Sequence, residues 1–390
     1  MDLFKASEQW ANRPVDERFW TVEEMYRATK EYAGAAVVST LPYNNLRLIS
    51  DGKEMKITGN SGQEATLTHY AFDQVCARAG APANFLRRLP AKLAEESINV
   101  ALSQRSDDAN ARLLFHKNGG LMLRCLTGEG YQRIWNHEVT AALADAQADG
   151  WKVPPARPSG RPGERTRIAT AEDCAKATGR SALIVKPGDT IAPAGLYASD
   201  RDMFAFMVDD DHVIENKLAP HAPLARGFFV WNSEVGDKVF GVMRFLYDFV
   251  CGNHIVWGAQ DVQEIRIRHV GTARDRAFAQ LKVELRQYAE SSSSEMEEKI
   301  TRAQTYELGA NKTETLAALF AFATRKKLQV VGKGMLESAY AVAEQTPRYG
   351  NPNTPWAISQ GLTQLSQDET YAERRVAVDR DAGKILEIAF

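Results

Sequence analysis

The sequence predicts an α+β protein with a central mixed or antiparallel sheet, a β-β-α unit within that sheet, and a helical C-terminal region. The densest apolar and aromatic content, between residues 226 and 258, contains two extended runs separated by a Gly-Asp turn signal. Short strand-like runs with Asp-Gly and Asn-Gly turns precede it, and segments with helical periodicity follow it. We therefore expect an N-terminal α+β region over residues 1–150, a central core over 151–290 and a helical region over 291–390.

Composition sets limits on the class of protein. The 390 residues are 44% hydrophobic and 25% charged, as in an ordinary globular protein. Neither a run of about eighteen apolar residues nor an N-terminal signal pattern is present, so we expect no membrane association and a cytoplasmic location. The four cysteines show no CxxC spacing, which argues against a zinc knuckle or a disulfide framework. With a net charge of −2, any nucleic-acid site must be a local patch.

The N-terminal region alternates helical and strand-like patterns. Thr21 and Glu24 form a capping-box signature at the start of a helix over 20–32. Asp51-Gly52 and Asn118-Gly119 each separate two apolar runs and predict hairpins. A helix over 137–148 has Asn136 as its candidate N-cap.

Residues 67–89 have the pattern of two short helices joined by a turn. Gly80 follows the first helix, and Pro82 suits the start of the second. One interpretation is a tight αα-hairpin used only for packing. The other is a helix-turn-helix that places Asn84, Arg87 and Arg88 against DNA.

The central unit is expected to be a hairpin, then a helix, then a return strand. Residues 227–232 and 239–242 can pair around Gly236-Asp237. Met243, Leu246, Tyr247 and Val250 are three and four apart, which predicts a helix that ends at Gly252, followed by a strand over 254–257.

The pattern after this unit is first alternating and then helical. Residues 262–269 alternate, so that Ile265, Ile267 and His269 lie on one face while Arg266 and Arg268 lie on the other. A helix is expected over 273–289, the serine run at 291–294 predicts a break, and further helices are expected over 295–303, 313–327, 335–344, 356–365 and 371–377.

Aspartates provide the best catalytic candidates. Two-metal phosphoryl chemistry needs several carboxylates that converge on cations, and a strand pair with acids at its ends could supply them. The alternative is a solvated turn, since Asp is a preferred turn residue. The candidates are Asp200, Asp202, Asp209 and Asp211.

Arginines and aromatic residues provide the candidates for nucleic-acid binding. Local positive charge can neutralise phosphates, and neighbouring rings can stack on unpaired bases. The alternatives are solvated arginines and core aromatics. The phosphate-binding candidates are Arg266, Arg268, Arg274 and Arg276, with Arg157, Arg161 and Arg165 as a mobile clamp and Trp231 as a stacking residue.

Several catalytic motifs are missing from the sequence. GxxxxGK[ST], GxGxxG after a strand, GxSxG and HExxH do not occur, and the histidines show no close ligand pair. ATP-driven, dinucleotide-dependent and zincin chemistry are therefore disfavoured, and we expect no cofactor.

Three segments carry a family resemblance. GEGYQRIWNHEV (128–139), GLYASDRDMFAFMVD (195–209) and the stretch ARGFFVWNSEVGDK onward from Ala225 resemble a domain-of-unknown-function family found on phages, prophages and plasmids. The resemblance implies a mobile-element setting and no established activity.

The leading hypothesis is a non-catalytic protein that binds single-stranded DNA, in preference to duplex, for annealing in phage or plasmid recombination or replication. A strand-strand-helix order also occurs in single-strand annealing recombinases, which need no nucleotide motif and commonly assemble as rings or filaments, so a homo-oligomer is compatible with this hypothesis. The main rival is a metal-dependent nucleic-acid-processing enzyme that uses the aspartates. A third class is an interaction protein that antagonises host defence.

Overall fold

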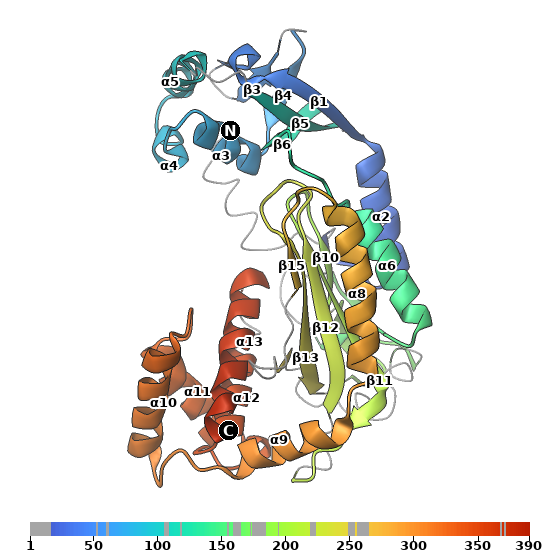
Figure 1. The fold of residues 1–390 in the computed structure, drawn as a ribbon, viewed down its shortest axis with the longest axis vertical. Coiled ribbons are helices and arrows are strands. Elements are labelled where there is room, and N and C mark those ends of the chain that lie inside the picture. The colour runs from blue at the N-terminus through green and yellow to red at the C-terminus, as the bar shows by residue number, and fades with distance from the viewer. Residues whose placement is uncertain are drawn as a thin grey trace.

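The structure is a computed structural model that describes residues 17–51, 54–59, 62–104, 109–117, 119–153, 156–158, 165–171, 173, 185–193, 195–218, 224–248, 254–255, 265–366, 369 and 372–390. These residues form a crescent, with one sheet at its N-terminal end, a second sheet in the middle and C-terminal helices at the other end (Figure 1). The predicted α+β class and the helical C-terminal region are confirmed.

The N-terminal sheet is mixed, with strand order β1-β5-β6-β4-β3-β2, and only β4 and β6 run parallel among the described strands. Both predicted hairpins form, as the pairs β2/β3 and β5/β6. Helices α3, α4 and α5 pack on one face around Phe72, Ile98 and Leu113. The elements are β1 (Ala36–Pro42), η2 (Tyr43–Asn45), β2 (Arg47–Ser50), β3 (Met55–Thr58), β4 (Glu64–Leu67), α3 (His69–Arg78), α4 (Ala83–Leu86), α5 (Ala91–Ser103), β5 (Asn110–Lys117) and β6 (Leu121–Gly128).

The central sheet is antiparallel, with order β10-β11-β12-β13-β14, and β15 also pairs with β13. Helices α2, α6 and α8 cover one face, where Phe228 and Phe240 are buried (Figure 1). Thr21 caps α2, because its hydroxyl accepts a hydrogen bond from the Glu24 amide, but the return bond of the predicted capping box differs, since the Glu24 carboxylate accepts from the Trp20 amide. The elements are α2 (Val22–Gly34), α6 (Asn136–Ala148), β10 (Leu196–Ala198), β11 (Met203–Ile214), β12 (Leu224–Asn232), β13 (Phe240–Asp248), β14 (His254–Ile255), β15 (Ile265–Ile267) and α8 (Ala273–Ala289).

The helix predicted from Met243 onward is wrong. Residues 240–248 form β13, which pairs with β12 along its length, so the β-β-α unit is absent at this place. A strand that is buried on both faces reads as a continuous apolar run, and such a run also matches helical spacing by chance. The return strand is confirmed at His254–Ile255, and the expected helix stop at Gly252 lies outside the described residues.

Two glycines allow the central sheet to pack bulky rings over neighbouring strands. A Cβ on Gly227 would lie 2.3 Å from the ring of Phe245, and a Cβ on Gly241 would lie 2.0 Å from the ring of Trp231. Glycine in a strand often marks such a close approach. The second face of the sheet is consequently aromatic, with Phe204, Phe206, Phe229, Trp231, Met243 and Phe245 all buried.

The C-terminal helices pack on one another and on the end of the central sheet. The serine run marks a break between α8 and α9, as predicted. Ile214, Leu224 and Leu246 of the sheet meet Ile300 and Trp356 of the helices. Within the described residues, no helix is long and apolar enough to cross a membrane.

The remaining elements are β7 (Arg157–Pro158), β8 (Arg167–Ile168), β9 (Thr190–Ala192), α9 (Ser293–Thr305), α10 (Lys312–Lys326), α11 (Lys333–Gln345), η4 (Pro347–Tyr349), α12 (Pro355–Ser366), α13 (Ala372–Leu386) and η5 (Glu387–Ala389).

Candidate functional site

The edge strand β15 presents two arginines on one side. Ile265, Ile267 and His269 are buried, whereas Arg266 and Arg268 are exposed, so the predicted alternation is confirmed for the described residues. Arg266 lies opposite Gly241 of β13. The strand therefore separates a packing face from a charged face, as its pattern predicted.

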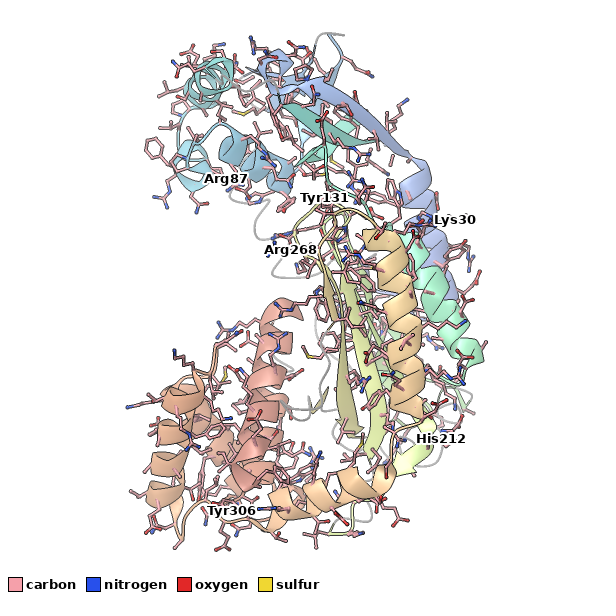
Figure 2. The ribbon with its side chains drawn as sticks, viewed as in Figure 1. Lys30, Arg87, Tyr131, His212, Arg268 and Tyr306 are labelled. Carbon is pink, nitrogen blue, oxygen red and sulfur yellow. The ribbon has the colours of Figure 1, made fainter. Side chains whose placement is uncertain are left out.

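The end of this arginine strand is fixed to a distant segment. Val270 forms a β-bridge with Tyr131, and the Gln132 amide donates to the carbonyl of His269 at 2.7 Å. The imidazole Nδ1 of His269 lies 3.2 Å from the Gln132 carbonyl, and the His269 ring stacks on Tyr131 with a centroid distance of 5.0 Å. Arg268 is consequently held beside Tyr131 (Figure 2).

Four arginines from three parts of the chain gather around this β-bridge, and we call them the bridge arginine cluster: Arg112, Arg133, Arg268 and Arg276. The guanidinium of Arg112 donates to the Tyr131 carbonyl at 2.9 Å, and that of Arg276 donates to the Val270 carbonyl at 3.1 Å. Arg133 donates to the Glu234 carbonyl, and its guanidinium lies over the rings of Tyr131 and Trp135.

The cluster carries positive charge that no ion pair with a described carboxylate neutralises. Within the described part of the chain, none of its four guanidinium groups forms an ion pair with a carboxylate. Backbone carbonyls orient a guanidinium group but carry no net charge to neutralise it. Arg268 and Arg276 are exposed, while Arg112 and Arg133 are half-buried. Such an arrangement is suited to binding an anion, since arginine matches phosphate geometry.

Two other predicted phosphate-binding arginines, Arg274 and Arg165, have carboxylate partners. Arg274 lies 2.8 Å from Glu138, so that its charge is neutralised in this conformation. Arg165 lies 2.5 Å from Glu24 and also donates to the Arg18 carbonyl, which fixes it to the start of α2. Arg157 belongs to β7 without a described side chain, and Arg161 lies outside the described residues.

Trp231 lies in the core of the central sheet. Its side chain is 7% exposed, and its ring covers Gly241 and lies 5.4 Å from the ring of Phe229. The ring faces are occupied by protein atoms, so in this conformation a base cannot stack on them. The half-buried rings beside the cluster are instead those of Tyr131 and Trp135.

Three candidate aspartates are spread along β11. Asp202, before the strand, is buried and lies 3.0 Å from the ammonium group of Lys238. Asp209, just past the middle of the strand, is 3.0 Å from Nδ1 of His212, and Asp211 is 2.9 Å from Lys152. His212 lies at the end of the sheet opposite Tyr131 (Figure 2).

The strand itself sets the separation of these acids. At roughly 3.3 Å per residue, an extended strand places Asp202 and Asp209 about 23 Å apart, too far for metal ions a few ångströms from each other. No group of three or more potential metal ligands occurs among the described residues. Asp202 therefore does not converge with Asp209 and Asp211 as the metal-site hypothesis requires.

Asn232, Ser233 and Glu234, at the turn between β12 and β13, are buried and form a polar junction. Asn232 donates to the Ile134 carbonyl at 2.8 Å and to Oδ1 of Asn136 at 2.9 Å. Asn136 is the first residue of α6 and not its N-cap, which is Trp135. The Glu234 carboxylate accepts from the Asn136 amide at 2.8 Å.

An ion pair lies at the centre of this junction. The guanidinium of Arg124 is 2.9 Å from the Glu234 carboxylate, and the two side chains are 0% and 2% exposed. Arg124 also donates to the Asp200 carbonyl at 2.7 Å and lies 4.4 Å from the ring centroid of Tyr32. Burial raises the pKa of Tyr32 to about 12 and raises the pKa of Asp200. The junction joins β6, α2 and the β12–β13 hairpin through polar groups.

The sequence contains a partial signal for this junction. The segments 128–139 and 225–238, which carry the family resemblance, are the ones that contact each other here, about 100 residues apart in sequence. The polar Asn-Ser-Glu run inside an apolar hairpin was the visible signal. Arg124 stands alone in a mostly apolar strand, and no local pattern indicates its partner.

The helix-turn-helix candidate has the geometry of a packed αα-hairpin. The second helix, α4, has four residues, and Gly80 between the helices has φ +66°. Arg87 lies 2.7 Å from Asp73 and covers the ring of Phe72. Its guanidinium is therefore engaged inside the unit, which favours the packing interpretation.

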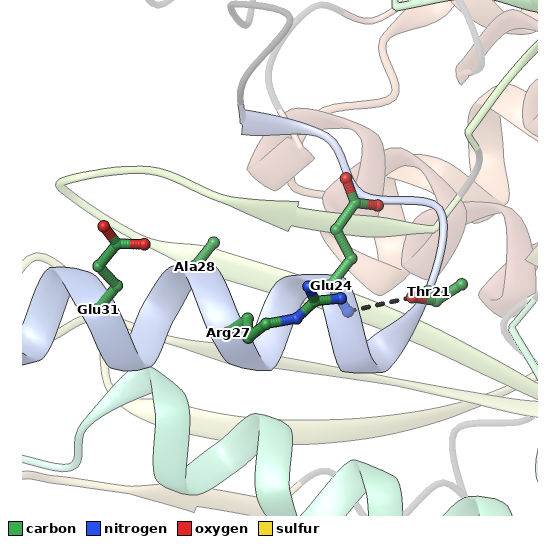
Figure 3. Close-up of a pocket in the computed structure, with 5 residues that line it drawn as sticks. All are labelled: Thr21, Glu24, Arg27, Ala28 and Glu31. Carbon is green, nitrogen blue, oxygen red and sulfur yellow. Dashed lines mark hydrogen bonds between the residues drawn. The ribbon is translucent and has the colours of Figure 1, made fainter.

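A shallow hollow runs along α2, lined by Thr21, Glu24, Arg27, Ala28 and Glu31 (Figure 3). Glu24 already accepts from the Trp20 amide at 2.8 Å and pairs with Arg165. The hollow has side chains of both charges and no buried polar atom directed into it, so we assign no chemistry to it.

Comparison with family models finds a match over residues 177–382, more than half of the chain, to a family described as a domain of unknown function, DUF932. Comparison with curated proteins and comparison with solved structures gave no match.

Proposed function

We propose that this chain, which belongs to the family described as a domain of unknown function (DUF932), binds single-stranded nucleic acid through the bridge arginine cluster, without hydrolysing nucleotides. The observation that carries the proposal is the set of four guanidinium groups around the Tyr131–Val270 bridge, none of which pairs with a carboxylate of the described residues. Phosphate contacts of this kind supply most of the affinity in sequence-independent binding.

The half-buried rings next to the cluster favour an unpaired strand. The Arg133 guanidinium lies over the rings of both Tyr131 and Trp135, with centroid distances of 5.4 and 5.5 Å. Alternating arginines and aromatic rings are typical of single-strand sites, where each stacked base contributes about 1–3 kcal/mol. We infer annealing or protection of single-stranded DNA in phage or plasmid recombination as the biological setting, in line with the family resemblance of the sequence.

Metal ions are not part of the proposed binding mode. Asp202, Asp209 and Asp211 each face a cationic or imidazole partner, and the first is separated from the other two by half of β11. Electrostatic binding through arginines needs no divalent cation, so binding should survive chelation.

The test is fluorescence anisotropy of a labelled single strand and of its duplex across a salt series, with and without EDTA. We expect tighter binding of the single strand, a steep loss of affinity with salt and no effect of EDTA. Arg268→Ala and Arg276→Ala should each weaken binding of every sequence and reduce the salt slope by about one.

Arg286→Ala is the matched control, because Arg286 is an exposed arginine on α8, the helix that carries Arg276, and pairs with Glu290 within one turn. Its affinity and salt slope should equal those of the wild type. Absence of binding to both forms at low salt would overturn the proposal, and an equal loss in all three variants would remove the cluster as its site.

A further inference from the structure

We propose that the edge strand β1 is a dimerisation interface, on which a second copy of this chain pairs antiparallel with its own β1. β1 is an outermost strand of the N-terminal sheet, and only β5 pairs with it among the described strands (Figure 1). Val37 and Val38 in this strand are 38% and 45% exposed. The inference goes beyond the proposed function and does not depend on it.

The backbone direction along β1 follows from its contacts with β5. The Lys117 amide donates to the Ala35 carbonyl at 3.1 Å, and the Tyr43 amide donates to the Ala109 carbonyl at 3.2 Å. Residues with odd numbers in β1 therefore point their N–H and C=O groups toward β5. Ala36, Val38 and Thr40 point theirs outward, and among the described residues no group meets them.

This outward row matches its own copy. With Val38 opposite Val38 of the second copy, Ala36 faces Thr40 of that copy, and each facing pair exchanges two backbone hydrogen bonds. The pairing segment ends four residues before Val38 at Gly34, where α2 ends, and four residues after it at Pro42, which lacks an N–H. In the two-fold arrangement, Gly34 of one copy faces Pro42 of the other at each end.

The charge pattern favours a second copy of the chain as the occupant. No charged residue occurs from Tyr32 to Leu46, so a two-fold arrangement brings no like charges from this segment together. Natural edge strands usually carry a charge, a bulge or a cover that prevents such pairing. Between Ala36 and Leu41, β1 carries no charge and no bulge, and no part of the chain that the structure describes covers its outer edge.

The opposite edge of the same sheet shows the protection that β1 lacks. On β2, the side-chain amide of Asn99 accepts from the Leu48 amide at 2.7 Å and donates to the Leu48 carbonyl at 2.8 Å. A side chain thus satisfies both backbone groups of Leu48 on that strand. Since one edge is closed from within the chain, the open edge is the one that can extend the sheet into a second copy.

A charge-swap experiment tests the symmetric pairing. By light scattering after size exclusion at tens of micromolar, the wild type should have about twice the chain mass of 43.3 kDa. Val38→Lys and Val38→Glu should each have the single-chain mass, because like charges then face each other across the axis. An equimolar mixture of the two variants should regain the doubled mass.

Val283→Lys is the control, since Val283 is a comparably exposed valine, 52%, on α8. It should keep the doubled mass, and circular dichroism should show all three variants folded. A wild type that stays at the single-chain mass overturns the proposal, which is the result expected if β1 instead receives a strand from another protein. A Val38→Lys variant that remains doubled, or a mixture that stays at the single-chain mass, also overturns it.

Discussion

The guanidinium of Arg124 and the carboxylate of Glu234 lie 2.9 Å apart with both side chains fully buried, and they connect the N-terminal sheet to the hairpin of the central sheet. Burial acts to lower the pKa of Arg124, but the Glu234 carboxylate beside it raises that pKa overall. The pair is thus charged, and each partner depends on the other, because an isolated buried charge is strongly unfavourable.

Glu234→Gln should reduce the free energy of unfolding by about 3 kcal/mol, since it leaves the Arg124 charge buried without a counter-ion. Urea unfolding followed by circular dichroism measures the change. Glu290→Gln is the control, because Glu290 pairs with Arg286 at the surface, with exposed fractions of 65% and 80%. Its effect should stay within about 0.5 kcal/mol, and equal effects of the two substitutions would contradict the buried-pair account.

Two glycines of the C-terminal helices should respond in opposite directions to alanine. A Cβ on Gly361 of α12 would lie 2.3 Å from the carbonyl oxygen of Ala339 on α11, so Gly361→Ala should destabilise by about 3 kcal/mol. A Cβ on Gly334 of α11 meets nothing within 4 Å, so Gly334→Ala should stabilise by up to about 1 kcal/mol. Thermal unfolding of both variants gives the two signs, and a stabilising Gly361→Ala would refute the close helix contact.

The contact between Trp231 and Gly241 should appear as coupling between two substitutions. Gly241→Ala alone should destabilise by roughly 1–3 kcal/mol, because the new Cβ overlaps the indole ring. In a Trp231→Leu background the same change should be milder, since the overlapping atoms are gone. A double-mutant cycle from urea unfolding measures the coupling, and strictly additive effects would show that the ring does not lie over Gly241.

Stability should fall in acid partly through His269. Burial lowers the pKa of His269 to about 4 in the folded state, whereas the unfolded chain binds the proton near the ordinary value of 6.5. The unfolded state therefore binds more protons between these values, and stability is complete above pH 6.5 and is lost as the pH falls toward 4. The loss amounts to roughly 3 kcal/mol for this group.

His269→Gln tests this assignment. A glutamine amide can donate to the Gln132 carbonyl as the imidazole does, but it does not titrate. The free energy of unfolding of the variant should change less between pH 6.5 and pH 4 than that of the wild type. If both curves have the same slope, the acid sensitivity originates in other groups, such as His116, whose pKa burial also lowers.

Removing the candidate metal-binding acids should leave nucleic-acid binding intact. Asp209→Asn and Asp211→Asn act at the end of the central sheet opposite the bridge arginine cluster, beside His212 and Lys152. The anisotropy titration of each variant should match the wild type with and without Mg²⁺. Loss of binding on either substitution, or on chelation, would instead favour the metal-dependent hypothesis.

Local patterns in the sequence determined much of this fold. The turn signals at Asp51-Gly52, Asn118-Gly119 and Gly236-Asp237 lie where hairpins form, and Thr21 caps the start of α2. The alternation around Arg266 and Arg268 also held in the structure, because solvent on one side and a core on the other impose a period of two. These features depend on neighbours a few residues apart.

Only the tertiary structure decided which residues work together. The run from Met243 became a strand because β12 pairs with it, and Trp231 became a core residue because Gly241 leaves room for its ring. The bridge arginine cluster, the Arg124–Glu234 pair and the open edge of β1 each join or expose segments that are distant in sequence. Periodicity reports which face of an element is buried, but it carries no information about which other element buries it, so contacts over such separations follow from packing alone.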